Sequence, residues 1–294
     1  MKLGLDDLLR GVQTVAIVCN QWGDSGKGKF ADWLAQWADV NARGTGGHNA
    51  GHTVDINGRE RIYHLIPVGI AYDSFGKITV LGNGMVIDVP YLCGEIDGLA
   101  AEGIPCNNLR VSKDAHLILP CHTLRDQAKN KSQKDGGIGS TGRGIGPCYA
   151  DKIGREGVLI ENLFDRDLLE RKIQKLLAKY EALRRGEFSL SVANSDELGL
   201  RQVKTLLDKI GIVLPDEEYE RISALPAEEL LDYYKSLVFS RIDIPFETES
   251  IIGTLMPFAE RIRPFVRDTV SEMREFMNQG KRISLEGAQG LLLG

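Results

Sequence analysis

An apolar run leads directly into a turn rich in glycine and lysine in the segment VQTVAIVCNQWGDSGKGKF, residues 12–30. The run at 12–20 is short and rich in β-branched residues, which predicts a buried strand, most readily a central strand of a parallel sheet. From residue 30 to residue 38 the apolar side chains Phe30, Leu34 and Trp37 recur at helical spacing. A strand, a glycine turn and a helix in this order are the opening of an α/β fold.

Further strands and helices are indicated along the chain. Strands are expected within 61–70, 77–89 and 282–286, and helices at 165–185, 196–210, 227–238 and 264–278, the last ended by Gly280. The polar, glycine-rich stretch 126–146 predicts a long functional loop. The predicted fold class is therefore α/β, with a mostly parallel central sheet flanked by helices, similar to P-loop NTPases. We expect one domain over 1–294, with a helical subdomain inserted at approximately 160–280.

The 294 residues have the composition of a globular protein, with 43% hydrophobic and 26% charged residues. A net charge of −5 gives no electrostatic reason to expect a nucleic-acid partner. No apolar run approaches the roughly 20 residues needed to cross a bilayer, and residues 1–10 have no signal-peptide core. The five cysteines are an odd number without a C-x-x-C pair, which disfavours a disulfide framework and predicts a cytoplasmic location.

The turn after the first strand has the form of a phosphate-binding loop. Gly23, Gly28 and Lys29 satisfy the pattern G-x-x-x-x-G-K, but Phe30 stands at the place of its final Ser or Thr. Glycines let backbone N–H groups turn toward an anion, and the helix N-terminus and the lysines add positive charge. The missing hydroxyl usually binds Mg²⁺, so Asp24 is expected either to replace it as a ligand or to accept a proton. A turn without any ligand is the alternative.

Two histidines stand four residues apart in GGHNAGHT, residues 46–53. The spacing is that of zinc-binding H-E-x-x-H, which leaves a metal hydrolase as one alternative. Against it, Asn49 replaces the glutamate and the glycines disfavour a helix. A loop close to a ligand is the better interpretation, with one imidazole that stabilises negative charge or donates a proton. For His48 a purely structural role is the other possibility.

Two more glycine motifs follow. No apolar strand leads into GGIGSTGRGIGP, residues 136–147, so a Rossmann loop is disfavoured. Ser140, Thr141 and backbone N–H groups suit a second phosphate, and Arg143, Lys152 and Arg155 supply charge. A surface loop is the alternative. EGAQG, residues 286–290, stands at the end of a predicted strand, where open α/β sheets bind ligands.

Together these motifs resemble those of the adenylosuccinate synthetase family. QWGDSGKGK at 21–29 is similar to the family's QWGDEGKGK, and GGHNAGHT, STGRGIGP at 140–147 and EGAQG are family strings. HLIP at 64–67 and GNG at 82–84 fit as well, in the same order over nearly the whole chain. Ser25 stands where the family has Glu, which predicts altered activity in an intact fold.

The resemblance implies a GTP-dependent ligase of purine biosynthesis. Such enzymes join IMP and L-aspartate to make adenylosuccinate through a 6-phosphoryl-IMP intermediate, with Mg²⁺. The family continues for a long stretch past EGAQG, so the resemblance implies that this chain is incomplete at its C-terminal end and weakly active or inactive alone. A non-catalytic nucleotide-binding fragment and another P-loop kinase or GTPase stay open as alternatives.

The resemblance also implies roles for single residues. Asp24 falls on the catalytic base and magnesium ligand, His52 on the acid, and Lys27 on the group that stabilises the transferred phosphoryl. The Gly51 carbonyl would join the metal shell, and Arg155 would reach the IMP site of the partner subunit in a homodimer. The implied GTP contacts are Gly23, Asp24, Ser25, Gly26, Lys27, Gly28, Lys29, Gly51, His52 and Thr53. The implied IMP contacts are Asp24, Ser25, Gly26, Lys27, Asn49, Ala50, Gly51, His52, Thr141, Arg155 and Gln289.

Overall fold

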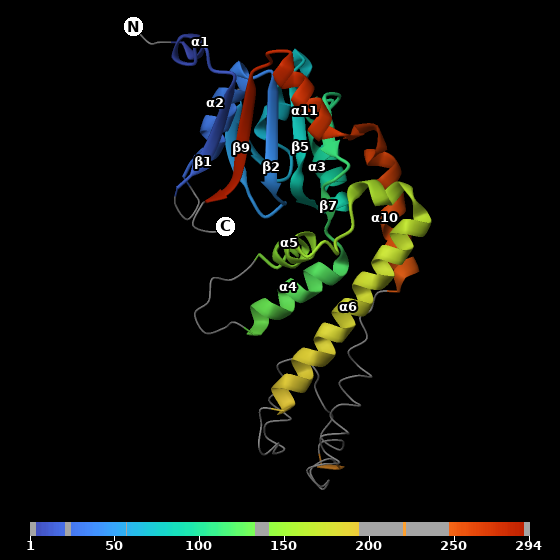
Figure 1. Cartoon of the computed structure of the whole chain (residues 1–294). Helices are drawn as coiled ribbons and strands as arrows, with labels where there is room; N and C mark the ends of the chain where they lie inside the picture. Colours follow the sequence, from blue (N-terminus) through green and yellow to red (C-terminus); the bar gives the residue numbers. More distant parts are fainter. Residues whose placement is uncertain are drawn as a thin grey trace.

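A parallel sheet lies in the upper part of the molecule as drawn in Figure 1; the computed structural model describes residues 4–20, 25–56, 58–132, 141–193, 220–221 and 247–290. The strand order is β1-β9-β2-β5-β6-β8, with β7 paired to β5, and each of these pairings is parallel. The strands are β1 Thr14–Cys19, β2 Val40–Gly46, β5 Ile78–Ile87, β6 Leu109–Ser112, β7 His116–Leu117, β8 Val266–Arg267 and β9 Ile283–Gly290. A separate antiparallel pair consists of β3 His52–Ile56 and β4 Arg59–Tyr63. The predicted α/β class with a mostly parallel sheet is confirmed.

Helices flank the sheet and extend beyond its lower end in Figure 1. The α-helices are α1 Leu5–Leu8, α2 Lys27–Trp37, α3 Val89–Ala101, α4 Pro120–Ser132, α5 Ile145–Ile153, α6 Arg166–Ala193, α10 Thr248–Ile262 and α11 Thr269–Asn278. The 3₁₀-helices are η1 Val68–Phe75, η2 Ile160–Phe164 and η3 Arg263–Phe265. Helices α4 and α5 lie beneath the end of the sheet, while α6 runs away from it beside α10. None of the helices in the described ranges is long and apolar enough to cross a membrane.

The opening strand and helix form as predicted, but β1 has a different place in the sheet. Among the described residues it lies at one edge, paired only with β9, instead of in the centre. Ile17 and Cys19 are buried, whereas Val18 on the other face is 68% exposed. The apolar run therefore predicted the strand and not its position. In α2, Leu34 and Trp37 are buried as the spacing indicates, but Phe30 is exposed.

Other expected elements are confirmed in part. The strands expected at 77–89 and 282–286 are β5 and β9, the helix expected at 165–185 is α6, and Gly280 follows α11 in the left-handed region. The helix expected at 264–278 begins only at Thr269, because Val266–Arg267 pairs with β6 and the Asp268 side chain caps α11 by accepting from the Ser271 N–H. The strand expected within 61–70 ends at Tyr63 and is followed by η1.

The prediction of a long loop at 126–146 was wrong for its first part. Helix α4 continues to Ser132, and α5 begins at Ile145. This part of α4 is polar, so hydrophobic spacing does not reveal it, but buried Asp126 accepts a hydrogen bond from the Gly144 N–H at 3.0 Å and ties α4 to the start of α5. The helices expected at 196–210 and 227–238 lie outside the described residues. The extent of the helical subdomain at 160–280 stays a prediction.

Glycines allow close approach where strands β2 and β5 pair. A Cβ added to Gly84 would lie 2.1 Å from the backbone oxygen of Gly44. We therefore expect Gly84→Ala to lower the free energy of unfolding by about 1–3 kcal/mol, because the two strands must separate. Urea unfolding measures the change. Gly98→Ala in the middle of α3 is the matched control, since a Cβ there meets no atom within 4 Å and alanine favours a helix. Equal stability of Gly84→Ala and the unmodified chain would contradict the expected clash.

Candidate active site

The described part of the first glycine loop begins at Ser25 and leads into α2. Gly26 stands at the N-cap with a φ of 72°, a left-handed conformation that favours glycine. Lys27, in the first turn, is 8% exposed, whereas Lys29 is exposed. A helix N-terminus with free N–H groups and a lysine attracts an anion. The described residues thus have the geometry expected of a phosphate site, while Gly23 and Asp24 lie outside them.

The first turn of α2 packs directly on the second loop. A Cβ added to Gly28 would lie 3.0 Å from the Thr53 backbone oxygen and 3.4 Å from the His52 Cβ. Only glycine allows this approach without a shift of the backbone. The contact places Lys27 and His52, which are both buried, on neighbouring segments. Two of the predicted motifs therefore meet as expected.

The fourth motif, EGAQG, lies beside both loops. Strand β9 pairs with β1 so that Glu286 lies opposite Ile17, and it pairs with β2 on its other side. Gly46 has a φ of 90°, and a Cβ there would lie 2.4 Å from the Ala288 Cβ. Because the carboxyl ends of parallel strands share one edge of a sheet, the first, second and fourth motifs converge at that edge.

The third motif joins this edge through α5. The Arg143 guanidinium donates from Nη1 to the backbone oxygen of His48. The Gly46 N–H donates to the Tyr149 hydroxyl at 2.6 Å, and that hydroxyl donates to the Gly84 oxygen at 2.9 Å. Arg143 was expected to supply charge to a phosphate, and its described contact is instead with the second loop. The three segments are thus locked together by hydrogen bonds.

His52 is the best-defined group of the cluster. Its Nδ1 lies 2.5 Å from Oε1 of Glu286, and the two side chains are 6% and 4% exposed. Within the described part of the chain, its Nε2 is buried without a hydrogen-bond partner, as are Nδ1 of His48 and Oδ1 of Asn49. Buried polar atoms normally have partners, so these three atoms of one loop are suited to contact a bound polar molecule.

His48 has a different environment from His52. Its ring packs on Tyr91 with the ring centroids 4.6 Å apart. Burial lowers the pKa of His48, Arg143 and His64 lower it further, and Asp88 acts in the opposite direction. Among the described residues there is no group of three or more His, Cys, Asp and Glu side chains placed to hold a metal ion. The zinc hydrolase alternative therefore finds no ligand set in this part of the chain.

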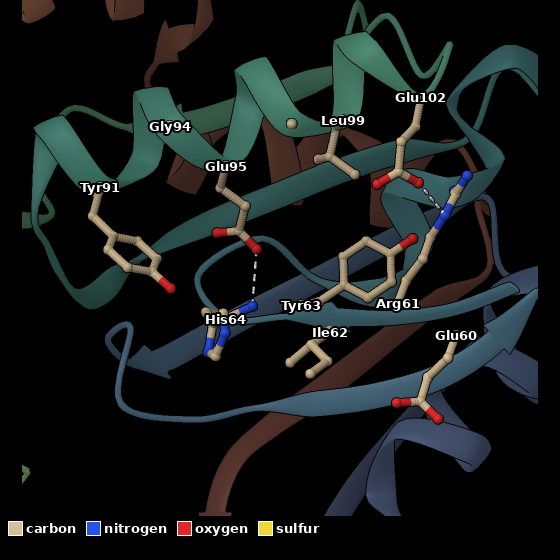
Figure 2. Close-up of a pocket in the computed structure, with 11 residues that line it drawn as sticks. Glu60, Arg61, Ile62, Tyr63, His64, Tyr91, Gly94, Glu95, Leu99 and Glu102 are labelled. Carbon is tan, nitrogen blue, oxygen red and sulfur yellow. Dashed lines mark hydrogen bonds and ion pairs between the residues drawn. The ribbon is translucent and has the colours of Figure 1, made fainter.

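A groove of about 460 Å³ lies between residues 60–64, at the end of β4, and one face of α3 (Figure 2). The Glu95 carboxylate accepts hydrogen bonds from the backbone N–H groups of His64, Leu65 and Ile66 at 2.8, 3.0 and 3.3 Å. Burial raises the pKa of Glu95, and these three bonds oppose the shift. The His64 Nδ1 lies 2.7 Å from the Ala50 oxygen. The wall of the groove thus supports the loop that contains His52.

The other predicted site residues differ in their exposure and contacts. Thr141 and Arg155 are exposed, and Arg155 has a φ of 60°, which is strained for a residue other than glycine. Lys152 donates to the Asn83 oxygen at 2.8 Å, so it contacts the GNG segment. Gln289 belongs to β9, but its side chain is not among those described. Ser25, Gly51 and Thr53 are exposed, and Ala50 is half-buried.

The sequence did not reveal three charged residues that support the cluster. Glu286 was quoted within a motif without a partner, and Glu95 had no signal of its own. Arg43 is fully buried and donates from Nη1 to the His64 oxygen. Burial lowers the pKa of Arg43, while Glu286 and Glu95 act in the opposite direction. Asn41 and Arg43 make the segment VNARG partly polar, so the sequence contains no signal that Arg43 is a buried charge, which needs neighbours of opposite sign.

These features define the class of protein: an α/β protein with glycine-rich loops gathered at the carboxyl ends of parallel strands, as is typical of nucleotide-binding folds. A sequence model of the family adenylosuccinate synthetase matches residues 16–220 and 207–294. The chain belongs to the adenylosuccinate synthetase family.

Individual relatives agree with this assignment. The adenylosuccinate synthetase of Halothermothrix orenii is 38% identical over 277 residues, which cover 94% of this chain and 52% of the relative. That of Lysinibacillus sphaericus is 35% identical over 280 residues, covering 95% and 52%. The solved structure of fully ligated adenylosuccinate synthetase from Plasmodium falciparum is similar with a TM-score of 0.67 and 28% identity, covering 96% of this chain and 52% of that one. The chain thus spans about half the length of the relatives that it matches.

Proposed function

We propose that this chain provides the phosphoryl-transfer site of an adenylosuccinate synthetase. The reaction joins IMP and L-aspartate to form adenylosuccinate, with hydrolysis of GTP to GDP and phosphate. The main support is the convergence of the motif loops on one edge of the sheet, where buried Lys27 and His52 lie on adjoining segments. Because a lysine, a helix N-terminus and an imidazole suit the transfer of a phosphoryl group, this site fits the first half-reaction.

In the proposed mechanism, the 6-oxygen of IMP attacks the γ-phosphate of GTP, and aspartate then displaces the 6-phosphoryl group. Asp24 would remove the N1 proton of the base, and the Lys27 ammonium would stabilise charge on the transferred group. His52 would act from Nε2, the ring nitrogen without a partner among the described residues. Asn49, whose buried Oδ1 also has no such partner, would contact IMP.

Mg²⁺ is the proposed cofactor. The expected ligands are the Asp24 carboxylate and the Gly51 carbonyl, both hard oxygen donors of the kind that Mg²⁺ prefers. Gly51 is exposed, and it precedes His52, which contacts the first turn of α2. The donor type and the place of Gly51 fit such an ion, which would neutralise phosphate charge when bound.

A homodimer and a cytoplasmic location complete the proposal. Arg155 would contact IMP bound to the partner subunit, which agrees with its exposure at the end of α5 and with its strained φ of 60°. Ile153, on the last turn of α5, is 78% exposed. All five cysteines are free and buried, as is common in a reducing compartment.

The test measures GDP release by the 294-residue chain alone and after co-expression with the second half of the Halothermothrix orenii synthetase. We expect release only from the co-expressed pair, and only with both IMP and L-aspartate present, because this chain spans about half the length of its relatives. The second half expressed alone is the control. GDP release without IMP would instead support a kinase or GTPase. IMP binding without GDP release, even in the pair, would support a non-catalytic nucleotide-binding fragment.

A further inference from the structure

His52 and Glu286 form a buried pair that joins the second loop to β9. Oε1 of the carboxylate lies 2.5 Å from Nδ1 of the imidazole. The other oxygen, Oε2, accepts the backbone N–H of Val68 at 3.0 Å. Because both oxygens are engaged, the carboxylate has a fixed orientation and presents one defined acceptor to the ring.

This contact determines which ring nitrogen bears the proton. An ionised carboxylate only accepts hydrogen bonds, so Nδ1 of His52 donates to it. When the ring bears one proton, the free lone pair is then on Nε2. No described residue forms a hydrogen bond with this buried Nε2.

Two further charges stabilise the arrangement. Arg43 is fully buried, and its charge interacts with both Glu286 and Glu95. Glu95 fixes the backbone that precedes Val68, through its bonds with His64, Leu65 and Ile66. The acceptor that faces His52 is therefore held by its own second hydrogen bond and by a buried cation.

We infer that Glu286 is a positioning residue, which holds the His52 ring in one orientation and one tautomer so that Nε2 alone faces the reacting groups. The inference rests on the proposed role of His52 in phosphoryl transfer. The competing explanation is that Glu286 only ties β9 to η1 through the Val68 N–H. In that case the tautomer of His52 would not depend on the charge of residue 286.

Glu286→Gln separates the two explanations. The Val68 N–H is an obligate donor, so the single oxygen of glutamine is expected to accept it and to leave the NH₂ group facing His52. Nδ1 must then accept, and the ring proton moves to Nε2. Long-range ¹H–¹⁵N spectra of the whole chain with ring-labelled histidine report the tautomer without any substrate, and His52→Asn assigns the signal. We expect a protonated Nδ1 in the unmodified chain and a protonated Nε2 in Glu286→Gln.

Asp73→Asn is the matched control, because it removes another buried carboxylate, which is 2% exposed and accepts hydrogen bonds from the backbone N–H groups of Asn107 and Asn108 and not from His52. It should leave the His52 signals unchanged. If Glu286→Gln does not fold, Glu286→Ala removes the acceptor of Nδ1 altogether, and a mixture of both tautomers is then expected. An unchanged His52 tautomer in the folded variant at position 286 would overturn the inference.

The kinetics of GDP release give a second readout, measured on this chain co-expressed with the second half of the Halothermothrix orenii synthetase. With the ring in the wrong tautomer, kcat should fall about 10- to 100-fold, while KM for IMP changes little. A purely structural role of Glu286 would instead change both constants or neither. If the unmodified pair releases no GDP, the proposed function fails, but the tautomer experiment still decides whether Glu286 positions His52.

Discussion

Replacing Asp151 by alanine is expected to lower the free energy of unfolding by about 3–5 kcal/mol, because it breaks a buried ionic cluster. The Asp151 side chain is fully buried and accepts hydrogen bonds from Lys179 Nζ at 2.6 Å, Tyr180 Oη at 2.8 Å and His122 Nε2 at 3.0 Å. His122 is also fully buried, and its Nδ1 already accepts the Leu119 N–H. The variant would therefore leave the buried His122 N–H and Tyr180 hydroxyl without their acceptor, while Lys179 would keep only its ion pair with Glu156. Urea unfolding at pH 7 measures the loss.

The same cluster predicts how stability depends on pH. Burial alone would raise the pKa of Asp151, but the hydrogen bonds from His122, Lys179 and Tyr180 outweigh it and lower the pKa from 3.8 to about 2. A carboxyl group with a lowered pKa in the folded state contributes stability that is fully present above its unfolded pKa and is lost as the pH falls through its folded pKa. The difference in stability between the unmodified chain and Asp151→Ala should therefore narrow between about pH 4 and pH 2.

Glu249→Ala is the control for this prediction. Glu249 also forms an ion pair, with Arg166 at 2.7 Å, but its side chain is 61% exposed. Exposed pairs contribute about 0–1 kcal/mol, so this variant should unfold close to the unmodified chain. A loss of similar size in both variants would show that burial does not account for the stability of the Asp151 cluster.

Much of the fold could be predicted because it depends on local patterns. The succession of an apolar strand, a glycine turn and a helix depends on residues that are neighbours in sequence, and β1 and α2 form where this pattern predicts them. The convergence of the motifs also follows from a general rule, since the carboxyl ends of parallel strands share an edge. The place of β1 did not follow, because the order of strands in a sheet depends on contacts between distant segments. Val18 is consequently exposed although the run around it is apolar.

The contacts between site residues could not be predicted from the sequence either, because they also join segments that are distant in the chain. His52 and Glu286 are 234 residues apart in sequence, and Gly46 and Tyr149 are 103 apart. His52, Glu286 and Gly46 stand in recognisable motifs and Tyr149 follows one, so the motifs could be chosen but not the contacts between them. Arg43 and Glu95 belong to no motif, and only their contacts in the folded molecule make them important. The sequence therefore predicted which loops would meet, and the structure adds the charged residues that hold them.

Lys27→Gln is expected to lower kcat for GDP release by about 10²–10³-fold in the co-expressed pair, the usual effect of removing one group that stabilises charge in the transition state. The Lys27 side chain is 8% exposed, and no described residue forms a hydrogen bond or an ion pair with its ammonium. A buried ammonium is costly without an anionic neighbour, and its place in the first turn of α2 suits a phosphoryl group.

Lys77→Gln is the control for Lys27→Gln, because it removes the same charge near the far end of the same helix. The Lys77 ammonium donates to the Gln36 oxygen at 3.1 Å and lies in an exposed contact. We expect this variant to keep the kcat of the unmodified pair, and both variants to unfold near the same urea concentration. Equal loss of GDP release in both would mean that overall charge, and not the place of Lys27, determines the rate. Unchanged release in Lys27→Gln would remove this lysine from the proposed site, whereas a selective loss would place the transferred phosphoryl group at the N-terminus of α2.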